Sequence, residues 1–323
     1  MGRISRWSLI LSLLFAGGFL ILAFRGASWE GMVGTARQGR MSLLILTFFL
    51  QSLSYFVRGL RWHVLLRIEK FIPPMTVFWA MMLGYLGNNF LPARAGELVR
   101  SAMIGRSAQI SKSYALATIL TERLIDMAVL VLICLGMVIF LKEMPGWLAS
   151  ALPILGAIGL AGLAALFFIP RHEHWLKTRL PRVLLPESLR DPASQILGKF
   201  FVGMHIFQHP SQALCFLGLT MIIWLIDSWV AIEVASAFNL TLTFIGALLL
   251  LGGLGLASMI PSTPGSIGIF QFVAVTVLVL FNFTRSEALV YIIALQAVVY
   301  AVVTVWGLIG IWRLGMHRKN AGL

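Results

Sequence analysis

The segment "GNNFLPARAGELVR", from Gly87 to Arg100, ends an apolar run with one proline, two glycines, one glutamate and two arginines. A second segment, "ASMIPSTPGSIGIFQF" from Ala257 to Phe272, interrupts another apolar region with two prolines and two glycines but no charge. Proline inside a helix removes a backbone hydrogen bond and clashes with the preceding turn, so it breaks or kinks the helix. Both segments therefore predict interrupted helices.

The composition shows which class of protein contains these interruptions. Of the 323 residues, 59% are hydrophobic and only 11% are charged, whereas a soluble domain carries about 25% charged residues. Apolar runs of 17 or more residues recur along the chain, and each is long enough to cross about 30 Å of hydrocarbon. The sequence therefore predicts an all-α polytopic membrane protein. Its net charge of +13 is typical of basic cytoplasmic loops and does not indicate nucleic-acid binding.

The positions of the apolar runs predict about six full spans and two broken or re-entrant units. The expected spans lie at about residues 8–24, 41–57, 119–141, 147–169, 212–232 and 287–312. The broken regions are 75–118 and 242–283, the latter being either a re-entrant hairpin or two full spans.

Lys and Arg residues set the expected orientation, because they accumulate in cytoplasmic loops. They cluster at residues 3–6, 58–70, 94–112, 171–199 and 313–319. Placing these clusters inside puts both termini in the cytoplasm and requires residues 75–118 to enter and leave on the same side. Residues 170–210 are then a cytoplasmic loop with interfacial helices.

The two interrupted segments share a pattern that suggests an inverted repeat. In each, an apolar residue and a proline are followed four positions later by a glycine, as in Pro92 with Gly96 and Pro261 with Gly265. The expected units, about 41–141 and 212–312, have opposite orientations, which is typical of transporters with broken helices near the membrane midplane. The residues expected to shape the breaks are Pro92, Gly96, Pro261, Pro264, Gly265 and Gly268.

Charged residues within the apolar segments are the candidates for a binding site, because ionisable groups in a membrane are costly. Glu97 and Arg100 are three positions apart, and Glu122 and Asp126 are four apart, so each pair shares a helix face. One interpretation is a set of internal ion pairs that hold helices together. The other is a polar cavity in which arginines bind a phosphate. The candidate substrate-binding residues are Asn88, Asn89, Arg94, Glu97, Arg100, Glu122, Arg123 and Asp126.

Enzymatic chemistry is not indicated by any motif. No group of His and acidic residues has metal-ligand spacing, and "GSIG" around Ser266 lacks the pattern of a nucleophile elbow. We therefore expect no catalytic residue, no metal and no cofactor.

Three stretches together resemble a known family. They are "LGNNFLPARAGELVR", "LATILTERLIDMAVL" and "PSTPGSIGIFQF", and they are similar to the membrane region of lysylphosphatidylglycerol synthases, which also occurs as stand-alone flippase-like proteins. The resemblance implies a single multi-span translocase domain over residues 1–323, with re-entrant segments. The resemblance also covers the candidate substrate-binding residues and the prolines and glycines that are expected to shape the breaks, as named above. Full synthases continue into a soluble aminoacyl-transferase domain, whereas this chain stops at Leu323, so we expect no aminoacyl transfer by the chain itself.

These observations lead to one expected function and two alternatives. We expect a flippase-like translocase of the bacterial inner membrane that moves a phosphate-containing lipid headgroup between leaflets. The family resemblance leaves open phospholipids, polyprenyl-phosphate glycolipids and hopanoids. Its expected partner is the lipid substrate, with a separate lipid-synthesis enzyme and a homo-oligomer left open. The alternatives are an intramembrane enzyme, or subunit, for glycosyl or aminoacyl transfer, and a non-catalytic scaffold for lipid synthesis.

Overall fold

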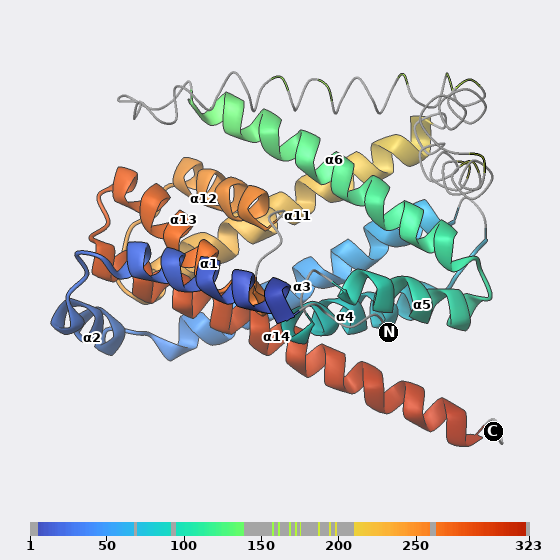
Figure 1. Ribbon diagram of the computed structural model, residues 1–323, viewed down its shortest axis with the longest axis horizontal. Helices are drawn as coiled ribbons and strands as arrows, with labels where there is room; N and C mark the ends of the chain where they lie inside the picture. Colours follow the sequence, from blue (N-terminus) through green and yellow to red (C-terminus); the bar gives the residue numbers. More distant parts are fainter. Residues whose placement is uncertain are drawn as a thin grey trace. The chain divides into compact units, whose positions relative to one another are not determined.

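The computed structural model describes residues 6–67, 70–91, 95–138, 210–258 and 263–320, together with isolated positions between 157 and 198. Within these residues every regular element is a helix and there is no strand (Figure 1). The expected helical class is therefore confirmed. The predicted span at 147–169, nearly all of the predicted loop at 170–210, and Pro92, Arg94 and Pro261 lie outside the described part of the chain.

The helices follow the apolar runs closely. They are α1 (Arg6–Phe24), α2 (Trp29–Arg37), α3 (Met41–Leu66), α4 (Pro74–Phe90), α5 (Gly96–Ala108), α6 (Lys112–Val138), α11 (Pro210–Ala237), α12 (Phe244–Ala257), α13 (Ile269–Leu278) and α14 (Arg285–Asn320). Two short 3-10 turns, η3 (Pro264–Ser266) and η4 (Val279–Phe281), flank α13.

Three of these helices are long and apolar enough to cross a membrane: α3, α11 and the Arg285–Arg313 part of α14. They contain the predicted spans at 41–57, 212–232 and 287–312. In contrast, α12 and α13 have only 14 and 10 residues, which at about 1.5 Å per residue gives about 21 Å and 15 Å. Neither is long enough to cross about 30 Å of hydrocarbon alone.

Two compact units make up the chain. The first consists of Met1–Ser54, Tyr85–Gly96 and Trp224–Leu323, and the second of Tyr55–Gly84 and Glu97–Ile223. Each unit therefore combines segments that are far apart in the sequence. The inverted repeat and the units at about 41–141 and 212–312 stay predictions.

In the first unit, the interruption between α12 and α13 is held by polar contacts. The helix α13 packs against α12, α14 and α1, and the carbonyl of Gly265 accepts hydrogen bonds from Gln296 and Tyr300 of α14. The N–H of Gly268, just before α13, donates to Oε1 of Gln271 at 2.7 Å. These side chains satisfy backbone groups that an unbroken helix would pair internally.

A substitution at Gly268 tests how tightly this interruption is packed. Its φ is 95°, which favours glycine, and a Cβ there would lie 2.5 Å from the carbonyl oxygen of Ala16 in α1. We expect Gly268→Ala to destabilise the protein by roughly 1–3 kcal/mol, measured as a lower thermal unfolding midpoint in detergent. Gly17→Ala is the matched control, because nothing lies within 4 Å of its added Cβ. Equal midpoints for the two variants would contradict the packing described here.

In the second unit, α3 continues further than its apolar run predicts. The basic cluster at 58–70 was expected to follow the span as a cytoplasmic loop, but α3 remains helical to Leu66. The physical reason is that no proline occurs until Pro73 and Pro74, so nothing ends the helix at residue 57. As a result Arg61 is only 1% exposed, and Trp62 beside it is fully buried.

Candidate functional site

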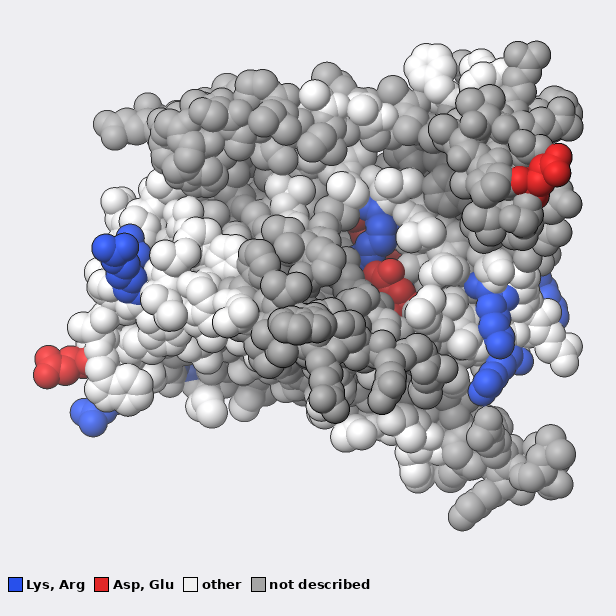
Figure 2. Space-filling view, in the orientation of Figure 1, with Lys and Arg blue, Asp and Glu red and all other residues white. Residues whose placement is uncertain are grey.

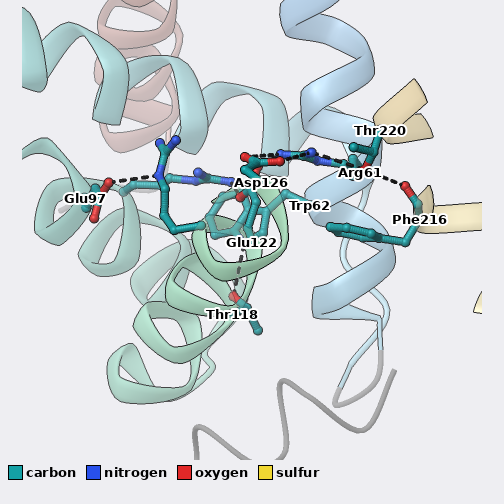
Figure 3. A network of polar contacts seen from close by, with 10 residues as sticks. Arg61, Trp62, Glu97, Thr118, Glu122, Asp126, Phe216 and Thr220 are labelled. Atoms are coloured by element: carbon teal, nitrogen blue, oxygen red, sulfur yellow. Dashed lines mark hydrogen bonds and ion pairs between the residues drawn. The ribbon is translucent and has the colours of Figure 1, made fainter. Parts of the chain in front are cut away.

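Arg61 belongs to a buried ion-pair cluster in the second unit (Figure 3). Its Nη2 donates to Oε1 of Glu122 at 2.6 Å and to Oδ2 of Asp126 at 3.0 Å. Its Nη1 donates to Oδ1 of Asp126 at 2.6 Å and to Thr220 at 3.3 Å. The planar guanidinium thus binds both oxygens of Asp126, a geometry available to arginine but not to lysine.

The regular spacing of α6 explains why one arginine meets two carboxylates. Glu122 and Asp126 are four residues apart, so their side chains project from the same face of α6, one turn apart. The guanidinium of Arg61 from α3 reaches both. Glu122 also pairs with Arg100 from α5. Nη2 of Arg100 donates to Oε2 of Glu122 at 2.9 Å. Glu122 therefore bridges two arginines that come from different helices.

Arg100 has an unusual environment. Its guanidinium carbon lies 3.7 Å from the centre of the Trp62 ring, and its side chain is only 3% exposed. Its Nε is buried and has no hydrogen-bond partner among the described residues. Because a buried donor without an acceptor is costly, this group is an indication of a ligand, as is Nε of Arg61, which also has no partner among the described residues.

The remaining ion pair forms the more exposed end of the cluster. Nε of Arg123 on α6 donates to Oε1 of Glu97 on α5 at 3.2 Å, and the two side chains are 25% and 18% exposed. Asp126 is 17% exposed, whereas Arg61 and Glu122 are 1% and 2% exposed. The cluster thus extends from a fully buried end around Arg61 to a partly exposed end at the Arg123–Glu97 pair.

Five of the predicted binding residues come together in this cluster, namely Glu97, Arg100, Glu122, Arg123 and Asp126. Asn88 and Asn89 lie in the last turn of α4, which belongs to the first unit. Oδ1 of Asn88 is buried with no hydrogen-bond partner among the described residues. Gly265 and Gly268 also belong to the first unit.

Two residues of the site, Arg61 and Trp62, were missed from the sequence. Arg61 was grouped with basic residues of a cytoplasmic loop. The sequence has no proline between residue 41 and Leu66, which could have indicated that the helix continues. Arg61 then lies more than five turns along α3, where it packs against other helices.

Asp227 is a second buried carboxylate, on α11 in the first unit. It is 8% exposed and accepts a hydrogen bond from the hydroxyl of Ser54. Its position between Trp224 and Trp229 predicts either a role at an outer membrane interface or a site, and both stay predictions.

The cluster contains charged side chains of both signs. In the described part of the chain no three His, Cys, Asp or Glu residues are placed to hold a metal ion. The cluster consists of three guanidinium groups and three carboxylates joined by ion pairs. On the face shown in Figure 2, by contrast, most of the described surface belongs to uncharged residues. Such an arrangement can bind an anion by exchanging a carboxylate for it.

Comparison with known proteins identifies the family. The family model described as "Lysylphosphatidylglycerol synthase TM region" matches residues 9–307. No curated protein and no solved structure matches the chain. The matched region includes every described residue of the ion-pair cluster and both interrupted segments. The chain is therefore a membrane protein that belongs to the lysylphosphatidylglycerol synthase TM region family.

Proposed function

We propose that this protein translocates a phosphate-containing lipid between the leaflets of the bacterial inner membrane, with both of its termini in the cytoplasm. Family membership supports a role connected with lipids, and the long apolar helices support a location in the membrane. In this proposal the acyl or prenyl chains of the lipid stay in the bilayer. Only the polar headgroup then needs a path through protein.

The observation that carries this proposal is the buried guanidinium of Arg100. A group that is 3% exposed and whose buried Nε–H has no partner among the described residues is a strong site for a phosphate oxygen. Charge-assisted hydrogen bonds between guanidinium and phosphate are about twice as strong as neutral ones. Arg123, at the more exposed end of the cluster, can bind the phosphate first and pass it inward.

The bridging position of Glu122 suggests how a phosphate enters. Glu122 is shared between Arg61 and Arg100. When phosphate takes its place on Arg100, Glu122 remains bound to Arg61, so no carboxylate is left buried without a cation. The cluster is closed in this conformation, and the lipid reaches Arg100 only after the packing around α5 and α6 opens. Alternating exposure of the site then carries the headgroup across.

The experiment uses purified protein in vesicles that contain trace acyl-labelled fluorescent lipids. The lipids are phosphatidylglycerol, phosphatidylethanolamine and a glucosyl diacylglycerol, which has no phosphate. Dithionite added outside bleaches only the outer leaflet, so translocation raises the bleached fraction above about half. We expect a rise for at least one phospholipid and none for the glycolipid. Equal rates for phosphate-containing and phosphate-free lipids would contradict recognition of phosphate.

The same vesicles separate a translocase from an enzyme. A translocase returns its lipid with unchanged mass, whereas glycosyl or aminoacyl transfer adds a group that mass spectrometry detects. Because the sequence contains no nucleotide-binding loop, we expect transport to proceed without ATP, either down the lipid gradient or coupled to an ion gradient. A proton gradient imposed across the vesicles distinguishes these two cases.

A further inference from the structure

We infer that Trp62 is a positioning residue of the phosphate site and that it fixes the orientation in which Arg100 presents its Nε–H, which has no partner among the described residues, to the ligand. The inference rests on the proposed function, in which Arg100 binds the phosphate of a lipid. It assigns to Trp62 a role that the pattern of charged residues in the sequence did not indicate.

The first part of the argument is the contact between the two side chains. The guanidinium carbon of Arg100 lies 3.7 Å from the centre of the Trp62 ring, and both side chains are buried. A cation over an indole face is stabilised by the ring quadrupole, most strongly when water is excluded. The indole therefore compensates part of the cost of burying the arginine without using any of its N–H donors.

The second part is the anchoring of the ring itself. Nε1 of Trp62 donates to the hydroxyl of Thr118 on α6 at 3.0 Å. That hydroxyl in turn donates to the carbonyl of Ala115 at 2.8 Å, so its lone pairs are oriented toward the indole. The ring is held at one edge by a hydrogen bond and is fully buried. Trp62 is thus a fixed surface between α3 and α6 on which the Arg100 side chain from α5 lies.

These two contacts determine which part of the guanidinium is available. One face of the group is covered by Trp62, and Nη2 is bound to Glu122. Nε remains as a buried donor with no partner among the described residues. A phosphate oxygen can bind in the guanidinium plane at Nε, and when Glu122 is displaced a second oxygen can bind at Nη2. The expected ligand contact is the two-point, in-plane pairing that arginine makes with phosphate.

Trp62→Leu tests this role, because it preserves an apolar side chain but removes the aromatic face. We expect the mole fraction of phospholipid needed for half-maximal transport to rise about tenfold, which corresponds to the roughly 1–2 kcal/mol of a desolvated cation–π contact. Trp62→Phe retains a ring and should recover most of the wild-type value. Trp79→Leu is the matched control, since it makes the same change elsewhere in the second unit and should leave half-saturation unchanged.

A direct binding measurement makes the test independent of transport. Native mass spectrometry of the detergent-solubilised protein, titrated with phosphatidylglycerol and phosphatidylethanolamine, gives the occupancy of bound phospholipid. We expect Trp62→Leu to lower the occupancy as Arg100→Ala does, with Trp62→Phe near wild type. If wild-type protein binds phospholipid through Arg100 but moves none, the proposed translocation fails while the role of Trp62 is still measured.

Two results would overturn the inference. One is that Trp62→Leu binds and transports phospholipid with wild-type half-saturation. The other is that Trp62→Leu and Trp62→Phe lose folded protein equally while the remaining folded fraction binds lipid normally, which would mean that the ring only fills space.

Discussion

Glu122→Ala should strongly destabilise the protein. Glu122 is paired with both Arg61 and Arg100, and its side chain is 2% exposed. Without it, Arg100 loses its acidic partner in the described cluster, while Arg61 retains Asp126. Removing one partner of a buried ion pair typically costs 3–5 kcal/mol because the remaining charge is buried without compensation. The unfolding midpoint in detergent should therefore fall sharply, with much less folded protein recovered.

Glu97→Ala is the control for this prediction. It also removes a carboxylate from an arginine, but the pair with Arg123 is longer, at 3.2 Å, and both side chains are partly exposed. Partly solvated ion pairs contribute about 0–1 kcal/mol, so the midpoint should change little. If Glu122→Ala unfolds at the same midpoint as Glu97→Ala, the bridging role of Glu122 in the fold is wrong.

Arg100→Ala should have the largest effect on transport. Its removal leaves Glu122 bound to Arg61 at 2.6 Å, so the buried carboxylate still has a cation and we expect the protein to fold. The phosphate, however, loses its buried partner. Truncating one member of a buried charge-assisted contact costs about 2–5 kcal/mol, so the transport rate should fall at least about 30-fold. The dithionite assay measures the rate, and size-exclusion chromatography confirms that the variant is folded.

Arg100→Lys separates charge from geometry at this position. Lysine keeps the positive charge but lacks the flat fork of donors and cannot lie along the Trp62 ring in the same way. We expect intermediate transport, above that of Arg100→Ala and well below wild type. Wild-type transport by the alanine variant would remove Arg100 from the site.

The sequence predicted the helical membrane class and the positions of the longest helices because apolar run length relates directly to membrane thickness. It also predicted that Glu122 and Asp126 share a face, since their separation matches one helical turn. Both results depend on patterns that are local in the sequence. The interruption before α13 was likewise indicated by proline and glycine, and the structure places Gly265 and Gly268 there with φ of 71° and 95°.

The residues that were missed depend on contacts between distant parts of the chain. The interaction of Arg61 with Glu122 spans 61 positions, and that of Trp62 with Thr118 spans 56. In the first unit, Tyr300 binds the carbonyl of Gly265 across 35 positions. No pattern of neighbouring residues in the sequence predicts contacts between residues so far apart. In addition, the expectation that arginines accumulate in loops placed Arg61 in a loop, whereas it is buried within α3, because the apolar run ends before the helix does.

The measurement that tests the central claim most directly uses wild-type protein in vesicles made from lipid extract of its own cells. A membrane-impermeant headgroup reagent is added, and mass spectrometry follows which lipids from the inner leaflet become labelled over time. We predict that a phosphate-containing lipid class is labelled faster than in protein-free vesicles and is recovered with otherwise unchanged mass. If no phosphate-containing lipid moves faster than in protein-free vesicles, with or without an imposed proton gradient, the protein is not the translocase proposed here.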